Sequence, residues 1–155
     1  MKPTAIDARR RRLAQFALAG TALALSGAAR ATQEQMAAAI KAFTGGAAPN
    51  QGKVTVDVAQ LVDNGNTVPV TVRVASPMSA AEHVTAIAIF NERNPQSDVA
   101  TFTLGPRSGK AEVSTRIRMA TSQKLTAVAR MSDGSFWSGS ADVIVTLAAC
   151  IEGEG

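Results

Sequence analysis

The residue of this chain best suited to covalent chemistry is Cys150, the only cysteine in the sequence. A cysteine that only supports a fold is usually buried in a core, and cysteines of exported proteins usually form disulfide pairs. This one follows the last predicted strand, which ends at Leu147, so three extended residues would carry the thiol up to about 10 Å beyond the fold. A thiolate is a nucleophile that forms persulfides and mixed disulfides. The position therefore indicates a reactive group that other proteins can reach.

The residues alone leave two other interpretations of this thiol open. Cys150 could be incidental, or it could join two copies of the chain through an intermolecular disulfide. Hydrolase chemistry is not expected, because a Cys–His pair would need a third orienting group and a rigid pocket. His83 is the only histidine and is expected on the surface at the start of a strand. With no second thiol or histidine, the sequence predicts no transition-metal site. No cofactor is expected.

Two further motifs have plainer explanations. The segment 105–110, Gly-Pro-Arg-Ser-Gly-Lys, resembles a phosphate loop, but its glycine spacing is one residue short and Ala111 replaces the required Ser or Thr. We expect a hairpin turn there. Phe136 and Trp137 are adjacent on a predicted strand and must point to opposite faces. One should lie in the core, and the other could cover an exposed patch or an interface.

The amino terminus predicts the compartment. Arg9 to Arg12 form a charged region, an apolar stretch runs from Leu13 to Leu25, and Ala29-Arg30-Ala31 supplies small residues for cleavage. This pattern is typical of a secretory signal and is too short to span a bilayer. The adjacent arginines, including Arg10 and Arg11, favour the twin-arginine export route. We therefore expect residues 1–31 to be a twin-arginine-type signal peptide and the mature protein to be periplasmic, with no membrane anchor.

The excess of basic residues in the whole chain comes from the expected signal peptide. The formal charge is +4, but residues 1–31 hold six Lys and Arg and one Asp, so the remainder carries 10 basic and 11 acidic side chains. A net charge near −1, with no basic stripe and no interleaved aromatic residues, argues against nucleic-acid binding. The 124 residues after the signal suit a single domain with a modest core.

The elements that must position Cys150 follow from the hydrophobic periodicity. A short helix is predicted over 32–43, with Thr32 as N-cap and with Met36, Ile40 and Phe43 on one face. After it the pattern has period two, and strands are predicted at 54–58, 68–74, 84–90, 99–104, 111–119, 125–131 and 136–147. Turn sequences separate them, and Asp133-Gly134 should close a tight hairpin. The sequence thus predicts a mainly β fold, an immunoglobulin-like antiparallel β-sandwich over residues 32–147 preceded by a short N-terminal helix, with a cysteine-bearing arm at 148–155.

Several motifs together resemble the SoxY family, the sulfur-carrier subunit of the SoxYZ complex in bacterial thiosulfate oxidation. They are Asn64-Gly65-Asn66-Thr67-Val68-Pro69-Val70, Ser76-Pro77-Met78, Phe90-Asn91 with Asn94-Pro95, Val99-Ala100-Thr101-Phe102, the run 108–118, Ala127-Val128-Ala129 and Met131-Ser132-Asp133-Gly134-Ser135. The resemblance covers the whole mature chain, the export signal and the terminal cysteine. It implies an immunoglobulin-like sandwich paired with a SoxZ-like subunit.

The resemblance also implies a role for the thiol. Cys150 would be the covalent attachment site of the sulfur intermediates. A SoxXA-like haem enzyme would join thiosulfate to it, a SoxB-like hydrolase would remove sulfate, and a sulfur dehydrogenase would oxidise the remaining sulfane sulfur. The chain itself would be the carrier and not the enzyme.

The tail departs from the family pattern, which is typically Gly-Gly-Cys-Gly-Gly at the extreme end. Here the neighbours of the cysteine are Ala148, Ala149, Ile151, Glu152 and Gly153. Alanines restrict the backbone more than glycines, and Ile151 adds bulk beside the sulfur. A second hypothesis is therefore a binding or scaffold subunit of the same complex, whose diverged tail carries no substrate. An ordinary exported sandwich that forms a disulfide dimer is the third.

Overall fold

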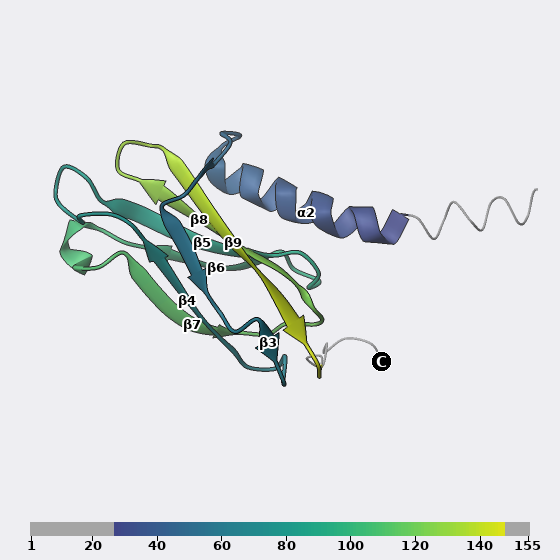
Figure 1. The fold of residues 1–155 in the computed structure, drawn as a ribbon. Helices are drawn as coiled ribbons and strands as arrows, with labels where there is room; N and C mark the ends of the chain where they lie inside the picture. Colours follow the sequence, from purple (N-terminus) through teal and green to yellow (C-terminus); the bar gives the residue numbers. More distant parts are fainter. Residues whose placement is uncertain (1–26, 148–155) are drawn as a thin grey trace, which may run out of the picture.

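The structure, a computed structural model, describes residues 27–147, with the side chains of its helix described from residue 33. Its elements are helix α2 (Gly27–Thr44) and strands β1 (Asn50–Gln51), β2 (Val54–Asp57), β3 (Leu61–Val62), β4 (Val68–Val74), β5 (Val84–Asn91), β6 (Asp98–Thr103), β7 (Glu112–Ile117), β8 (Gln123–Met131) and β9 (Phe136–Val145). Two sheets pack face to face, and α2 lies along one side of them (Figure 1).

The strand order matches the predicted immunoglobulin-like sandwich. The smaller sheet has the order β2-β4-β7, and the larger has the order β1-β9-β8-β5-β6. All pairs between the seven longer strands are antiparallel. The two-residue strands β1 and β3 are additions that the sequence does not predict, and both pair parallel to β9. The sandwich is therefore antiparallel except at the edge next to β9.

The core lies between the two sheets and is built from small branched residues. In β4 the burial alternates strictly, and its four valines, Val68, Val70, Val72 and Val74, all face inward. Ile87 and Ile89 of β5 and Leu125 of β8 meet them from the larger sheet. Alternation of apolar and polar residues is what a strand with one covered face requires, so the period-two prediction is confirmed.

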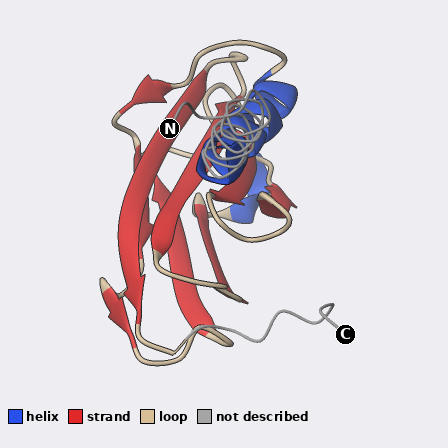
Figure 2. Cartoon of the chain, turned by 90° about the vertical axis from the view of Figure 1, so that its right-hand side faces the viewer, coloured by secondary structure: helices blue, strands red, loops and turns tan. Residues whose placement is uncertain are grey.

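The larger sheet is covered on its outer face as well. Ala88, Phe90 and Val128 are buried there under one face of α2. That face consists of Met36, Ala39, Ile40 and Phe43, so the predicted apolar stripe of the helix is confirmed. Viewed along its axis in Figure 2, the helix lies against one side of the strands.

The helix begins earlier than the sequence predicts. It starts at Gly27 and not at Thr32, because Ala28, Ala29 and Ala31 are strong helix formers and continue the helix backwards. Its end is as predicted, since Gly45 and Gly46 both have positive φ. Ala29 and Ala31 of the expected cleavage site thus lie in the first turns of α2.

Two local predictions need correction or refinement. The segment 105–110 is not a hairpin turn: it connects β6 of the larger sheet to β7 of the smaller sheet through the 3-10 turn Pro106–Ser108. Both kinds of connection use Pro, Ser and Gly, so local composition cannot distinguish them. The hairpin at Asp133-Gly134 between β8 and β9 is confirmed, with Gly134 at φ 84°.

Phe136 and Trp137 point to opposite faces, as predicted, and each is partly buried against a different cluster. Trp137 packs against the main core, and the Lys53 ammonium lies 5.0 Å from its ring centroid. Phe136 packs under α2, with its ring centroid 6.0 Å from that of Phe43. Helix α2 therefore covers the outer face of the larger sheet, where Phe136 could otherwise have formed an exposed aromatic patch.

Candidate functional site

Cys150 and its neighbours Ala148, Ala149, Ile151, Glu152 and Gly153 lie outside the described residues, as do Arg10 and Arg11 of the export signal. The structure does describe the residues that directly precede the predicted arm. The last described residue, Leu147, is two residues past the end of β9 and three before the cysteine. The geometry around the end of β9 is therefore the described part of the candidate site.

A short parallel strand holds the end of β9. Leu61 and Val62 of β3 are paired with Ile144 and Val145. The Ile144 N–H donates to the carbonyl of Gln60 at 2.8 Å, and the Thr146 N–H donates to the carbonyl of Val62 at 3.0 Å. Thr146 also donates its hydroxyl to the carbonyl of Asp63 at 3.2 Å. Backbone pairing thus continues past β9 itself, almost to the arm.

The turn before β4 holds the next residue. The Gly65 N–H donates to the carbonyl of Leu147 at 2.8 Å, and the Gly65 carbonyl accepts from the Met119 N–H at 2.8 Å. Asn64 shapes this turn, because its side-chain oxygen accepts from the backbone N–H of Asn66 at 2.9 Å. Gly65 is buried, so these bonds are protected from water. Leu147 is therefore bonded to one loop and, through Gly65, connected to a second.

A serine closes the other side of β9. The Ser122 hydroxyl oxygen accepts from the Val145 N–H at 2.9 Å. The same hydroxyl lies 3.4 Å from the Val145 carbonyl, to which it donates. β8, the strand that pairs with β9 on this side, starts only at Gln123. The Ser122 side chain therefore makes the hydrogen bonds to Val145 that a strand backbone would otherwise make.

An amide network joins the loops at this end of the sandwich. Asn94 donates from its side chain to the carbonyl of Arg118 at 2.8 Å and accepts from the Ala120 N–H at 3.0 Å. Gln123, which is buried, donates to the same Asn94 oxygen at 2.7 Å and accepts from the Arg93 N–H at 2.8 Å. Every buried nitrogen and oxygen atom of these two side-chain amides has a hydrogen-bond partner. The network therefore orders the loops without the cost of an unsatisfied buried polar group.

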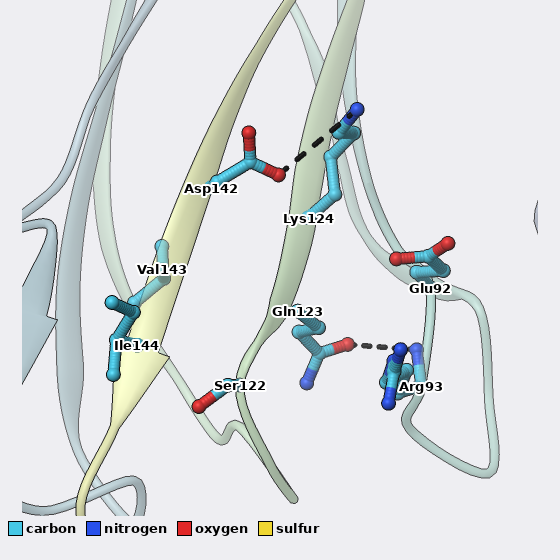
Figure 3. Close-up of a pocket in the computed structure, with 8 residues that line it drawn as sticks. All are labelled: Glu92, Arg93, Ser122, Gln123, Lys124, Asp142, Val143 and Ile144. Carbon is cyan, nitrogen blue, oxygen red and sulfur yellow. Dashed lines mark hydrogen bonds and ion pairs between the residues drawn. The ribbon is translucent and has the colours of Figure 1, made fainter.

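A cavity of about 260 Å³ opens beside this network on the outer face of the larger sheet. It is lined by Glu92, Arg93, Ser122, Gln123, Lys124, Asp142, Val143 and Ile144 (Figure 3). Lys124 and Asp142 face each other across β8 and β9 at 4.0 Å, a long ion pair between well-exposed groups. The cavity carries both signs of charge, so it does not select strongly for an anion or a cation.

Large apolar side chains are exposed at the same end. Within the described chain they are Leu61, Ile144 and Leu147, exposed by 60%, 59% and 61%. The sequence analysis did not single them out. A signal was present: Val143, Ile144 and Val145 are consecutive apolar residues at the end of an alternating strand, so the middle one must point to the opposite face from its neighbours.

Among the described residues two groups have shifted pKa values, and both lie outside this end. Hydrogen bonds to Asp57 and Glu112, each 2.8 Å long, raise the pKa of Arg73 on the exposed face of the smaller sheet. Hydrogen bonds from Ser135 lower the pKa of Asp133 in the β8–β9 hairpin. Both groups stabilise their own local structure and have no evident part in chemistry at Cys150.

His83 directly precedes β5, as predicted, and is partly exposed. Its Nδ1 lies 3.0 Å from the carbonyl of Ser79, which holds the ring against the preceding turn. Over residues 27–147, no group of three His, Cys, Asp or Glu side chains is arranged to hold a metal ion. In the same part of the chain, no helix has the length and apolar character that crossing a bilayer requires.

Comparisons with known proteins agree with this geometry. The family model described as "Sulfur oxidation protein SoxY" matches residues 40–150, so the match runs through the end of β9 and reaches the cysteine. The solved structure of the sulfur carrier protein SoxY from Chlorobium limicola f thiosulfatophilum is similar with 29% identity and a TM-score of 0.63. That alignment covers 74% of this chain and 94% of the other.

More distant structures share the fold alone. A superoxide reductase (neelaredoxin) from Ignicoccus hospitalis has 17% identity and a TM-score of 0.54, over 61% of this chain and 80% of its own. A putative superoxide reductase from Thermotoga maritima has 17% identity and a TM-score of 0.52, over 66% and 89%. Among curated protein sequences, none matches the chain.

Proposed function

Because this chain belongs to the SoxY family of sulfur oxidation proteins, we propose that it is a covalent sulfur carrier that holds its intermediates on the thiol of Cys150. The observation that carries the proposal is the family match to residues 40–150, which ends on the cysteine. The structure of the similar Chlorobium protein, itself described as a sulfur carrier, supports the same role. The carrier presents the substrate, and separate enzymes perform the reactions.

The chemistry needs only an accessible thiolate from this chain. In the first step the thiolate sulfur of Cys150 bonds to the outer sulfur of thiosulfate, and the two electrons released pass to the haem of a SoxXA-like enzyme. In the second step a SoxB-like hydrolase adds water across the terminal sulfur–sulfur bond, so that sulfate leaves with two protons and a persulfide anion stays on the cysteine. A sulfur dehydrogenase would then oxidise that persulfide sulfur to the sulfonate level, with oxygen from three water molecules and with six electrons passed to the dehydrogenase's own electron acceptor.

The described residues support this use of the arm. Hydrogen bonds to Gln60, Val62, Gly65 and Ser122 hold residues 144–147 in place. The thiol is three residues further on, so the Cα of Cys150 lies within roughly 11 Å of the Cα of Leu147, and the sulfur can reach a few ångströms beyond that. A partner enzyme that recognises the sandwich therefore always finds the thiol within a small volume, which raises its effective concentration.

We propose the periplasm as the site of action and a SoxZ-like subunit as the stable partner. The family supports both, and the expected signal peptide of residues 1–31 supports export. The first helix side chain with a described contact outside the helix is Gln33, which donates to Glu92, directly after β5, at 2.6 Å. Cleavage after Ala31 would leave that contact and the whole apolar face of α2 intact.

The test is the mass of the carrier under turnover. The mature chain and its partner subunit are incubated with thiosulfate and the haem enzyme, with and without the hydrolase, and the intact mass is measured. We expect Cys150 to gain the mass of one thiosulfate without the hydrolase and of one sulfur atom with it. A Cys150 peptide that stays unmodified in both reactions overturns the proposal.

In this chain the cysteine is flanked by Ala149 and Ile151, where the family typically has glycines on both sides. This difference favours a second candidate function, a scaffold subunit that holds the complex together while another copy carries the substrate. The Cys150→Ser variant separates the two functions. The carrier function predicts that thiosulfate oxidation is lost, and the scaffold function predicts that it is unchanged. A double variant, Ala149→Gly with Ile151→Gly, should raise the loading rate if the arm of this chain is used but is stiff and bulky.

A further inference from the structure

The turn that is bonded to Leu147 contains an Asn–Gly pair. Asn64 is exposed, and Gly65 directly after it is buried. Asparagine is a chemically labile residue. Its loss begins when the backbone nitrogen of the next residue attacks the side-chain amide carbon, and a following glycine has no side chain to hinder that attack. The pair is therefore a candidate site of covalent modification, and its surroundings decide how fast it reacts.

The side chain of Asn64 is held in an arrangement that favours this attack. Its Oδ1 accepts from the backbone N–H of Asn66 at 2.9 Å and from the Asn66 side-chain nitrogen at 3.0 Å. The first of these bonds folds the Asn64 side chain back along its own backbone, toward the peptide bond to Gly65. Negative charge develops on Oδ1 when the amide carbon is attacked, and the two donors stabilise that charge. The electrophilic carbon is therefore activated.

The attacking nitrogen, in contrast, is blocked. The backbone nitrogen of Gly65 must first lose its proton, which is also the first step of amide hydrogen exchange. Its N–H donates to the carbonyl of Leu147 at 2.8 Å, and the Gly65 carbonyl accepts from the Met119 N–H at 2.8 Å. A buried, hydrogen-bonded amide loses its proton only while the structure around it is open. The bond to Leu147 therefore limits the reaction of Asn64.

We propose that Asn64 is a deamidation site whose reaction is held back by the hydrogen bond between Gly65 and Leu147. The Gly65 nitrogen gives up its proton and bonds to the side-chain carbon of Asn64, and the former amide nitrogen leaves with that proton as ammonia. Water then opens the cyclic imide at either carbonyl, which yields aspartate or isoaspartate. In isoaspartate the backbone runs through the side chain and is longer by a methylene group, so Gly65 is displaced from Leu147.

The modification and the bond to Leu147 are thus coupled in both directions. Loosening of Leu147 speeds the reaction at Asn64, and the isoaspartate that forms loosens residues 144–147 further. Chemistry at Cys150 plays no part in either step, so this coupling is independent of the proposed carrier function.

The experiment follows Asn64 and the Gly65 N–H in the same samples. The mature full chain with its partner subunit is incubated at mildly alkaline pH, folded and in urea, as wild type, Ser122→Ala and the exposed control Ser140→Ala. Mass spectrometry quantifies the peptides in which aspartate or isoaspartate replaces Asn64, and amide exchange of Gly65 is measured in parallel. Asn66 is the internal control of the same peptide, because the β-branched Thr67 after it shields the attacking nitrogen.

We expect folding to slow the reaction of Asn64 and the exchange of the Gly65 N–H by the same factor, to within about threefold. Ser122→Ala should raise both rates of the folded protein about fivefold, the effect of one lost hydrogen bond on an opening equilibrium, and Ser140→Ala should raise neither. Unequal factors for the two rates, in the wild type or in Ser122→Ala, overturn the control by Leu147. An Asn64 that reacts no faster than Asn66 in the unfolded chain overturns the site itself. Isoaspartate-containing protein with wild-type exchange over residues 144–147 overturns the coupling.

Discussion

The backbone N–H of Gly65 donates to the carbonyl of Leu147 at 2.8 Å and so ties the last described residue before the cysteine to the turn that precedes β4. Gly65 is bonded in turn to Met119 in the loop before β8. Leu147 is thereby connected to both sheets, since β4 belongs to the smaller and β8 to the larger. The proposed carrier function needs such a fixed origin, so that a partner enzyme could recognise the sandwich and the thiol together.

Ser122→Ala should loosen this origin. The change removes the acceptor of the Val145 N–H and leaves that group with no described partner, at a cost of about 1 kcal/mol in the free energy of unfolding. Amide exchange measured by mass spectrometry should accelerate over residues 144–147. Ser140→Ala on the exposed face of the same strand is the matched control and should change neither quantity. Equal exchange in both variants would show that Ser122 does not hold the end of β9.

Gly139→Ala should destabilise the sandwich strongly. A Cβ at this position in β9 would overlap the carbonyl oxygen of Val54 in β2, where the two sheets approach each other closely. We expect a loss of about 2–4 kcal/mol in the free energy of unfolding, measured by urea denaturation. Gly105→Ala is the control, because its Cβ would meet nothing within 4 Å and its φ of −151° suits any residue. Equal unfolding midpoints for the two variants would contradict the close approach.

Phe43→Ala should release the helix from the larger sheet. The Phe43 ring packs edge-on against Phe90 at 6.1 Å and Phe136 at 6.0 Å, so its removal takes away the centre of that contact. The expected cost is about 2 kcal/mol in the free energy of unfolding, together with a loss of helical circular dichroism at lower denaturant than the sheet signal. Lys41→Ala, on the exposed side of the helix, is the control: its helical and sheet signals should be lost at the same denaturant concentration.

Asp133 makes the stability of the hairpin depend on pH at the acid end. The hydroxyl and the backbone N–H of Ser135 favour the charged carboxylate, so the pKa of Asp133 lies below its usual 3.8. A group with a lowered folded pKa contributes its stability above the unfolded pKa and loses it as the pH falls through the folded pKa. The difference in unfolding midpoint between wild type and Asp133→Ala should therefore be present at pH 7 and shrink below about pH 3.8. In an NMR titration, Ser135→Ala should move the pKa of Asp133 upward, and an unchanged value would contradict the assigned cause.

The sequence predicted the longer elements because each carries its own signal. The valines of β4 alternate with polar residues, and Met36, Ile40 and Phe43 recur at helical spacing, so the face that each element buries could be predicted without its neighbours. The two-residue strands β1 and β3 could not, because a strand that short has no period and forms only where β9 offers it an edge. The start of α2 was placed too late, because a good N-cap at Thr32 competes with a run of alanines that also favours helix.

The sequence by itself determined where the single thiol lies along the chain, at position 150, and which family the motifs resemble, SoxY. Residue positions and motifs can be read from the sequence alone and do not depend on how the chain folds. Only the tertiary structure decided what surrounds that origin. Leu61, Gly65 and Ser122 come to the end of β9 from three separate segments, and contacts between residues so far apart in sequence exist only once the two sheets have packed.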